Sequence, residues 1–354
     1  MEMVVQRIFV IVILGLFTLI PCYAAIPSTT QRLINKVNKD GPYLGIVIPN
    51  MFEMNPLLQH SNFQSTNTID FAGKRFRFGT IHEQQVVLVM TGLAMINAGA
   101  TTQLLLSLFN IKGVVHYGIA GNANSSMNIG DVTIPQFWAH TALWNWQRYG
   151  DGPDDELALE INGDYTRKIG YLNFANYSTN VGNCSSGDNF LNNVWYQPEE
   201  IFPVDGVPEQ RQHAFWLPID SYYLEISKKL EGLELEKCVN STTCLSTTPK
   251  VAIVSKGASA NIFLDNASYR DFLYDKFGIS LVDMESAAVA LVCRQQRVPY
   301  VVFRALSDLA GGGSAESNEA AAFASLAANN SVVVVVEFVR ILASMEWEWQ
   351  SLNM

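Results

Sequence analysis

Two acidic residues stand next to apolar segments, where a carboxylate has chemical consequences. Asp308 follows the apolar run PYVVFRAL and precedes three glycines, in FRALSDLAGGG. Glu285 lies near the start of the segment MESAAVALVCRQQ, whose other members are mostly apolar or small. A carboxylate in such surroundings costs free energy unless it is paired or hydrogen-bonded. Each acid therefore either caps a structural element or faces a ligand cavity, and these stretches alone leave both interpretations open.

The elements that must position these acids alternate between strand and helix. Short β-branched runs bounded by turn residues predict strands at 43–48, 84–90, 114–120, 251–255 and 299–306. Apolar residues at helical spacing predict helices over 96–109 and 284–296. This alternation indicates an α/β fold with a central, mainly parallel sheet flanked by helices. Ligands of such sheets bind beyond the carboxyl ends of the strands, and Asp308 lies at one of these ends.

Residues 141–249 break the alternation with many Trp, Pro, Asn and Asp residues. We interpret them as a Trp-rich insertion in a single domain spanning 26–354, because a predicted strand resumes at 251. A separate domain is the alternative. Near the C-terminus, the five valines 332–336 have strand propensity, but the helical spacing around them favours a helix.

The first 25 residues have the pattern of a secretory signal peptide. Arg7 precedes an apolar run over 8–20, which is shorter than the ~20 residues that span a bilayer, and PCYAA offers a small-residue cleavage site. An uncleaved anchor is the alternative. We expect a secretory route to the extracellular space or the vacuole, with no membrane association after cleavage.

Secretion changes the meaning of the cysteines and of the N-x-S/T sequences. Four cysteines remain after residue 25 and allow three pairings; a local bridge between Cys238 and Cys244 is plausible, and Cys293 fits a free buried thiol. Possible glycosylation acceptors are Asn124, Asn176, Asn183, Asn240, Asn266 and Asn329.

Charge and histidine spacing argue against several classes of partner. The net charge is −10 and no basic patch is large enough to follow a phosphate backbone, so we expect no nucleic-acid partner. The five histidines form no close ligand pair in the sequence, so we predict neither a metal nor another resident cofactor.

Taken together, DMESAAVA and FRALSDLA resemble the signature of the purine and uridine phosphorylase superfamily. The resemblance is closest to methylthioadenosine/S-adenosylhomocysteine nucleosidases and to plant bark and vegetative storage proteins. GIVIPNMFEMNPLL and VVHYGIAGNANSSMNIGDVTIP support it, and it covers about 41–140 and 250–345. It implies a three-layer nucleoside phosphorylase-like fold, a small nucleoside ligand, a homo-oligomer, and phosphate as a possible co-substrate.

The resemblance also implies roles for individual residues. Asp308 matches the general acid that protonates the departing purine, and Glu285 matches the carboxylate that holds the ribose hydroxyls. Met284 would pack against the sugar, and Phe263 would stack on the base. The remaining implied substrate-site residues are Ala120, Gly121, Leu93, Thr91 and Ser307.

Three features depart from the pattern of active relatives. Met54 falls at the position of the glutamate that orients the attacking water, and a thioether cannot act as a general base. Glu53 stands one residue away and would substitute only if the loop shifts. Ile119 replaces a Ser or Thr, and near Thr91 the sequence shows no arginine in the place of a phosphorylase's anion cradle.

Three functions therefore stay open. Intact Asp308 and Glu285 favour an enzyme that cleaves the N-glycosidic bond of a purine-type nucleoside with phosphate or water. Met54 and Ile119 favour a plant nitrogen-storage protein with reduced or lost catalysis. Nucleoside binding without turnover is the third possibility. We favour the enzyme over the store.

Overall fold

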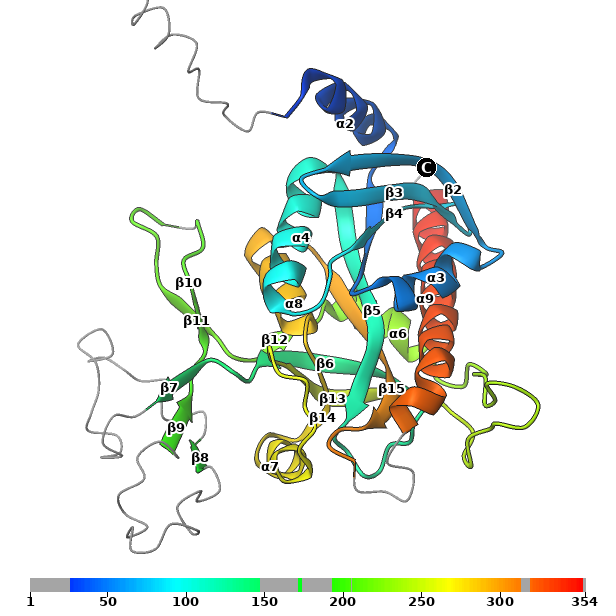
Figure 1. The fold of residues 1–354 in the computed structure, drawn as a ribbon. Coiled ribbons are helices and arrows are strands. Elements are labelled where there is room, and N and C mark those ends of the chain that lie inside the picture. Colours follow the sequence, from blue (N-terminus) through cyan, green and yellow to red (C-terminus); the bar gives the residue numbers. More distant parts are fainter. Residues whose placement is uncertain (1–25, 147–170, 174–192, 205, 313–318, 353–354) are drawn as a thin grey trace, which may run out of the picture.

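The computed structural model describes residues 26–146, 171–173, 193–204, 206–312 and 319–352 (Figure 1). Its main sheet has ten strands. They are β1 (Tyr43–Ile48), β2 (Phe63–Phe71), β3 (Lys74–Ile81), β4 (Gln84–Met90), β5 (Ile111–Asn122), β6 (Val132–His140), β12 (Leu217–Pro218), β13 (Val251–Ser259), β14 (Ile279–Asp283) and β15 (Tyr300–Leu309). All five predicted strands are present, as β1, β4, β5, β13 and β15.

The sheet mixes parallel and antiparallel pairs. β1 lies between β4 and β5 and is parallel to both, and β15 is parallel to β5. β15 also pairs with β6, which continues through β13 and β14 back to β5, so five strands close into a ring. The antiparallel hairpin β2–β3 extends the open edge beyond β4. The sequence did not predict this hairpin, because most β2 side chains are exposed and the strand lacks an apolar run.

Helices cover both faces of the sheet, as the α/β pattern predicts. They are α2 (Ser28–Asp40), α3 (Met51–Gln59), α4 (Met95–Leu108), α6 (Ser221–Lys228), α7 (Ala267–Phe277), α8 (Ser286–Gln296) and α9 (Glu319–Leu352). α4 and α8 pack together on one side of β5, and α9 packs on β15 and β5 on the other (Figure 1).

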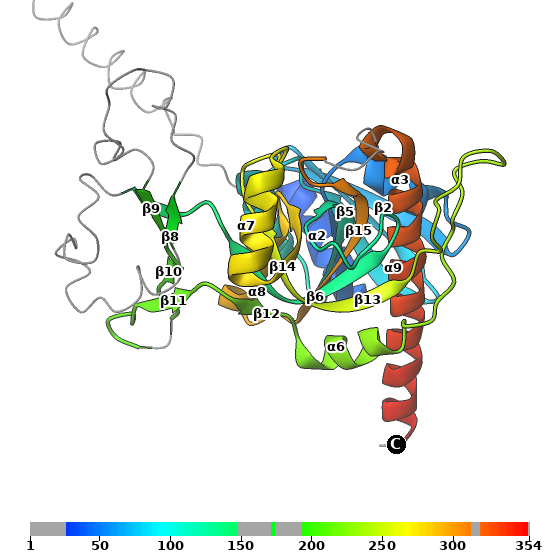
Figure 2. The same ribbon diagram turned by 90° about the horizontal axis from the view of Figure 1, so that it is seen from below.

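The Trp-rich segment forms small sheets that project from the main body (Figure 2). One contains β7 (Trp144–Trp146), β8 (Tyr171–Asn173) and β9 (Asn193–Tyr196), and the other contains β10 (Glu199–Ile201) and β11 (Gln212–Ala214). Tyr196 packs against Phe272 and Phe277 of α7. From Leu217 on, β12 pairs with β6, and α6 packs on α9 and β15. The projecting part therefore ends well before 249, the expected boundary of the insertion.

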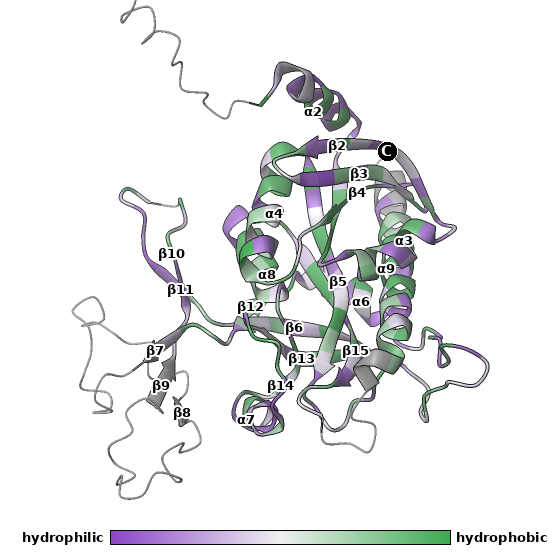
Figure 3. Cartoon of the chain, viewed as in Figure 1, coloured by the Kyte–Doolittle hydropathy of each residue, from purple (hydrophilic) through white to green (hydrophobic). Residues whose placement is uncertain are grey.

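The valine run lies inside α9, so the prediction of a helix is confirmed. Residues Ala322–Glu346 are long and apolar enough to cross a membrane by length and composition, yet 67% of the most apolar window is buried in the protein. Figure 3 shows strong hydrophobic colour on α4 and α9 and more hydrophilic colour on the β2–β3 hairpin. Packing against the sheet accounts for the apolar character of α9.

The cysteine predictions that fall on described residues are confirmed. Cys238 and Cys244 form a disulfide, and Cys293 is a buried free thiol in α8. The signal peptide, Cys184, Asn176 and Asn183 lie outside the described residues.

Candidate active site

The carboxyl ends of three strands meet at one place. Asp308 at the end of β15 is in register with Gly121 of β5, and Gly121 also pairs with Val282 of β14. β14 then leads directly into Asp283 and the start of α8. The ring of strands therefore brings together two segments, 283–285 and 307–308, that are far apart in the sequence.

A cavity of about 200 Å³ opens at this meeting point. Its lining includes Pro49, Asn50, Glu53, Leu93, Ile119, Ala120, Gly121, Ile262, Phe263, Leu264, Val282, Asp283, Met284, Glu285, Ser307 and Asp308. All but one of the predicted site residues are in this set, together with Glu53. Leu93 and Phe263 stand at the rim, with 56% and 76% of their surface exposed.

Thr91 is the predicted site residue that does not line this cavity. Its side chain is buried, and its hydroxyl donates to the carbonyl of Gly92 at 2.6 Å. Thr91 lines a neighbouring cleft together with Lys74 and Arg77 of the β2–β3 hairpin. The cations near Thr91 thus come from a hairpin that the sequence did not predict.

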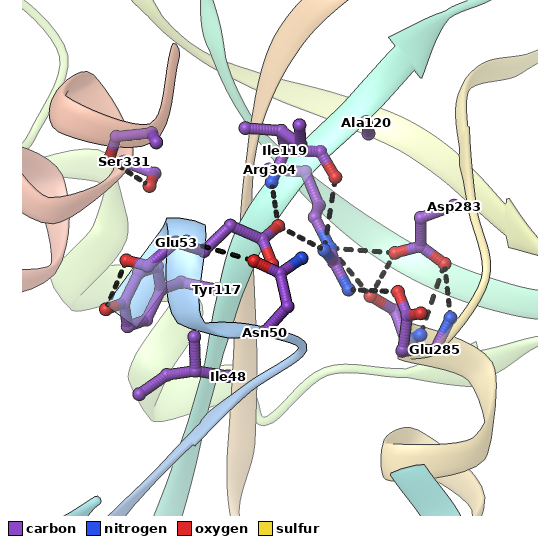
Figure 4. Close-up of polar contacts among 12 residues, drawn as sticks. Ile48, Asn50, Glu53, Tyr117, Ile119, Ala120, Asp283, Glu285, Arg304 and Ser331 are labelled. Carbon is purple, nitrogen blue, oxygen red and sulfur yellow. Dashed lines mark hydrogen bonds and ion pairs between the residues drawn. The ribbon is translucent and has the colours of Figure 1, made fainter. Parts of the chain in front are cut away.

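Arg304 is fully buried and holds the acids of one wall together (Figure 4). Its Nε lies 2.8 Å from Asp283 Oδ2, and its Nη2 lies 3.4 Å from Glu285 Oε2. Its Nη1 lies 3.8 Å from Glu53 Oε1 and donates to the carbonyl of Ile119 at 3.1 Å. Three buried carboxylates therefore share one guanidinium.

Glu285 directly precedes α8, but its side chain does not cap that helix. Oε1 instead accepts a hydrogen bond from the backbone N–H of Ala94, at the start of α4, at 2.9 Å. Burial raises the pKa of Glu285, and the nearby Arg304 guanidinium opposes that rise. Of the two interpretations of Glu285, the structure supports the cavity-facing carboxylate.

Glu53 lies in the first turn of α3, which Asn50 caps by accepting from the Glu53 N–H at 3.1 Å. Glu53 Oε1 accepts from the Ile119 N–H at 2.8 Å. Oε2 is buried and has no hydrogen-bond partner among the described residues. Burial raises the pKa of Glu53 to about 7, against the opposing effects of Arg304 and the Ile119 N–H.

Met54, by contrast, is fully buried in the hydrophobic core and is not part of the cavity lining. The expectation that Met54 stands at the nucleophile end of the site is therefore wrong. The reason is helical geometry: neighbouring residues on a helix point about 100° apart, so only one of this pair can face the cavity. The structure places a carboxylate, Glu53, where the sequence comparison placed a thioether.

Asp308 lines a part of the cavity that we call the Asp308 end, and it is partly exposed. The Ser307 hydroxyl donates to its Oδ1 at 2.6 Å. Burial raises the pKa of Asp308 and the negative charge of Asp265 adds to the rise, while the Ser307 hydrogen bond opposes it. This environment favours the protonated acid, the form that can donate a proton.

The glycines after Asp308 allow its loop to pack tightly against the start of α7. Gly311 has a φ of +79°, and a Cβ there would lie 2.3 Å from the Ala267 nitrogen. Arg270 of α7 donates to the carbonyls of Ala310 at 3.0 Å and Gly312 at 2.7 Å. Loop packing next to the acid therefore requires a glycine at position 311.

Sequence reasoning missed Arg304, Asp283 and Asn50. A signal existed for Arg304, because it interrupts an otherwise apolar strand, and a charge in a buried strand must be paired. Asp283 and Asn50 sit next to segments that were singled out, but only the fold shows that they contact the same wall.

The chain belongs to the phosphorylase superfamily, whose family pattern matches residues 43–180 and 238–340. It is 35% identical over 253 residues to bark storage protein A of Populus deltoides, which covers 71% of this chain and 73% of that protein. It is 25% identical over 251 residues to a 5'-methylthioadenosine/S-adenosylhomocysteine nucleosidase of Bacillus cereus (strain G9842), covering 70% and 78%.

A solved structure shares the fold at lower identity. The 5'-methylthioadenosine/S-adenosylhomocysteine nucleosidase of Colwellia psychrerythraea, solved in complex with adenine, superimposes with a TM-score of 0.56 at 20% identity. The match covers 85% of this chain and 95% of that one. This likeness confirms the nucleoside phosphorylase-like fold.

Proposed function

We propose that this chain is a storage protein of the bark type whose cavity still binds a purine-type nucleoside. The storage role is carried by one observation: identity to a bark storage protein, at 35%, exceeds identity to a nucleosidase, at 25%, over similar lengths. Ile119 lies in the cavity wall where active relatives have Ser or Thr, which agrees with reduced or lost catalysis.

The storage role predicts that the amount of protein follows nitrogen supply. We expect it to accumulate strongly under high nitrogen or before dormancy and to fall when growth resumes. Quantitative immunoblots across tissues and nitrogen regimes test this. Constant low abundance in every tissue would contradict storage while leaving the cavity proposal intact.

Nucleoside binding is carried by two acids that line one cavity. Glu285 and Asp308 line the same 200 Å³ space, with the apolar residues Phe263, Met284 and Leu93 among its walls. A purine nucleoside offers matching chemistry, because its hydroxyls can donate to a carboxylate and its base can accept a proton. The structural relative that is solved with adenine supports this choice.

Thermal shift measurements test binding directly. We expect adenosine and 5'-methylthioadenosine to raise the Tm with saturation, and ribose alone to have a much smaller effect, because a ligand that binds only the folded state stabilises it. An unchanged Tm at millimolar ligand would contradict the proposal.

Cleavage by water is a second candidate function, and Glu53 favours it. Glu53 lines the cavity, its Oε2 has no hydrogen-bond partner among the described residues, and a pKa of about 7 allows the carboxylate to accept a proton near neutral pH. In this reaction Glu53 takes a proton from water, the oxygen bonds to the sugar C1, and the C1–N bond breaks. The departing base takes up the proton from Asp308, so the products are free base and free sugar.

Water suits the cavity better than phosphate as the nucleophile. No arginine or lysine of the described residues lines this cavity, and the buried guanidinium of Arg304 behind its wall already contacts Asp283, Glu285 and Glu53. A phosphate dianion beside three carboxylates would meet repulsion without a free cation to offset it.

Cleavage is tested by measuring the release of free adenine by chromatography, in reactions with and without phosphate. We expect slow release that does not depend on phosphate, and its loss in Glu53→Gln. A parent protein that binds nucleosides without releasing base would contradict cleavage and leave binding intact. A rate that requires phosphate would contradict the role of water.

The secretory route is part of the same proposal. The Cys238–Cys244 disulfide supports it, since disulfides persist in oxidising compartments. Fusing residues 1–25 to a cytosolic reporter tests it: we expect export of the reporter, and its retention in the cytosol would contradict the route.

A further inference from the structure

Two of the N-x-S/T sequences, at Asn124 and Asn240, adopt the same local turn in different surroundings. We propose that Asn240 is an attachment site for an N-linked glycan and that Asn124 is not. This inference uses the proposed secretory route, but neither residue belongs to the cavity wall described above.

Asn240 lies in the loop that the Cys238–Cys244 disulfide closes, between α6 and β13. Its side-chain oxygen accepts hydrogen bonds from the hydroxyl of Thr242 at 2.9 Å and from the backbone N–H groups of Thr242 and Thr243 at 3.0 and 2.9 Å. The residue is exposed, and its side-chain Nδ2 makes no hydrogen bond to the described residues. The acceptor nitrogen is therefore free and solvent-facing.

Asn124 forms the matching turn with Ser126, whose N–H and hydroxyl donate to Asn124 Oδ1 at 2.9 and 2.8 Å. Its Nδ2, however, donates to the hydroxyl of Ser280 in β14 at 3.3 Å, and the residue is only partly exposed. A glycan on this nitrogen would have to displace the contact with the sheet. The two sites thus share the turn and differ in the freedom of the nitrogen.

The modification joins Asn240 Nδ2 to C1 of a sugar. The donor class is a lipid-linked oligosaccharide diphosphate: its C1–O bond breaks as the N–C1 bond forms, the lipid diphosphate leaves with the bonding electrons, and Nδ2 loses one proton. The acceptor pattern requires Ser or Thr two residues after the asparagine, and Thr242 supplies this hydroxyl, which donates to the oxygen of the same carboxamide.

The loop lies away from the cavity. In Figures 1 and 2 it extends from the body beyond α9, on the side opposite α4 and α8. A glycan at Asn240 therefore leaves the cavity open, and its loss should not alter nucleoside binding.

Site-by-site occupancy in secreted protein tests the proposal. The chain is produced in cultured animal cells behind a heterologous signal peptide, so a failure of residues 1–25 to direct export does not affect the result. Mass spectrometry of peptides after enzymatic deglycosylation in heavy-oxygen water then reports each asparagine. We expect Asn240 to be modified in most molecules and Asn124 to be unmodified.

Substitutions distinguish the contribution of the acceptor asparagine from that of the hydroxyl residue in its turn. Asn240→Gln and Thr242→Ala should each remove one glycan mass, Thr242→Ser should keep it in part, and Asn124→Gln should change no mass beyond the substitution. The ligand-induced Tm shift should be the same in all four. Unmodified Asn240 in secreted, disulfide-bonded protein, or occupancy at Asn124 equal to that at Asn240, would overturn the proposal.

Discussion

The two ends of the cavity use the same chemical group in opposite surroundings. At the end formed by α3 and α8, three carboxylates surround one buried guanidinium, and Arg304 opposes the effect of burial on Glu53 and Glu285. At the other end, Asp308 has the Ser307 hydroxyl as its partner and a second carboxylate, Asp265, nearby. The acids of the first end share a buried cation, whereas Asp308 is paired with a neutral hydroxyl.

The difference shows that a shared cation offsets part of the cost of burying an acid. Burial raises the pKa of Glu53, Glu285 and Asp308. Arg304 opposes this rise for Glu53 and Glu285, which helps carboxylates beside it to face a developing positive charge. Asp308 has no guanidinium to oppose the rise among the described residues, and the negative charge of Asp265 adds to it.

Removing the guanidinium should have the largest effect. Arg304→Met leaves Asp283, Glu285 and Glu53 buried without a cation, which typically costs about 3–5 kcal/mol of folding free energy. Urea unfolding at neutral pH measures the loss. Arg75→Met is the matched control, because the Arg75–Asp70 pair is exposed and we expect it to be nearly neutral. Equal losses of unfolding free energy in the two variants would contradict a special role for the buried guanidinium.

Removing the acidic proton of Asp308 should slow base release without lowering the stability of the fold. If the chain cleaves nucleosides, Asp308→Asn should lower the rate of base release about 10²–10⁴-fold, because an amide cannot protonate the leaving base. The urea midpoint should stay near that of the parent, since Asp308 has no ionic partner among the described residues. An unchanged release rate would show that Asp308 does not protonate the leaving base.

The pH dependence of stability should reveal the proton on Glu53. Its pKa is about 7 in the folded protein, above the ordinary value of 4.5, so the folded state holds a proton that the unfolded state releases. This contribution to stability is complete below pH 4.5 and is lost as the pH rises to 7, by up to about 1.4 kcal/mol per pH unit.

The substitution Glu53→Gln removes that ionisation and isolates its contribution. The stability of the variant relative to the parent should rise between pH 5 and pH 7 and level off above the folded-state pKa. Urea unfolding of both proteins at a series of pH values gives the difference. A difference that does not change with pH would mean that Glu53 is already ionised throughout this range.

Substitution of Met54, the neighbour of Glu53, should have the smallest effect on stability and on the cavity. Met54→Leu conserves volume in the core, so we expect a cost below about 1.5 kcal/mol and no change in nucleoside binding or release. The pair Glu53→Gln and Met54→Leu therefore tests which of two adjacent residues serves the cavity. Loss of ligand binding in Met54→Leu but not in Glu53→Gln would show that Met54, the position predicted from the sequence, serves the cavity.

Much of the fold could be predicted from the sequence, for physical reasons. Buried parallel strands such as β1 and β15 are continuous apolar runs, so their pattern is strong. Hairpin β2–β3 was missed because its exposed strand has little apolar signal, and with it the cations beside Thr91. The small sheets of the Trp-rich segment have strands of three or four residues, which are too short for periodicity to predict.

The candidate site was predicted in composition but not in geometry. Asp308 and Glu285 could be found because carboxylates next to apolar runs are unusual. The direction of Glu53 depends on where α3 begins, a boundary of one residue that sequence patterns do not fix. The role of Arg304 depends on three partners from two segments far apart in the sequence, Glu53 of α3 and the pair Asp283 and Glu285, which only the fold brings together.

A crystal structure with a non-cleavable adenosine analogue tests the central claim most directly. The account predicts the base within hydrogen-bond distance of Asp308, the ribose hydroxyls on Glu285, and Glu53 Oε2 facing the sugar C1. An analogue bound outside this cavity, or one whose base lies at the Arg304 end and whose sugar lies at Asp308, would contradict it.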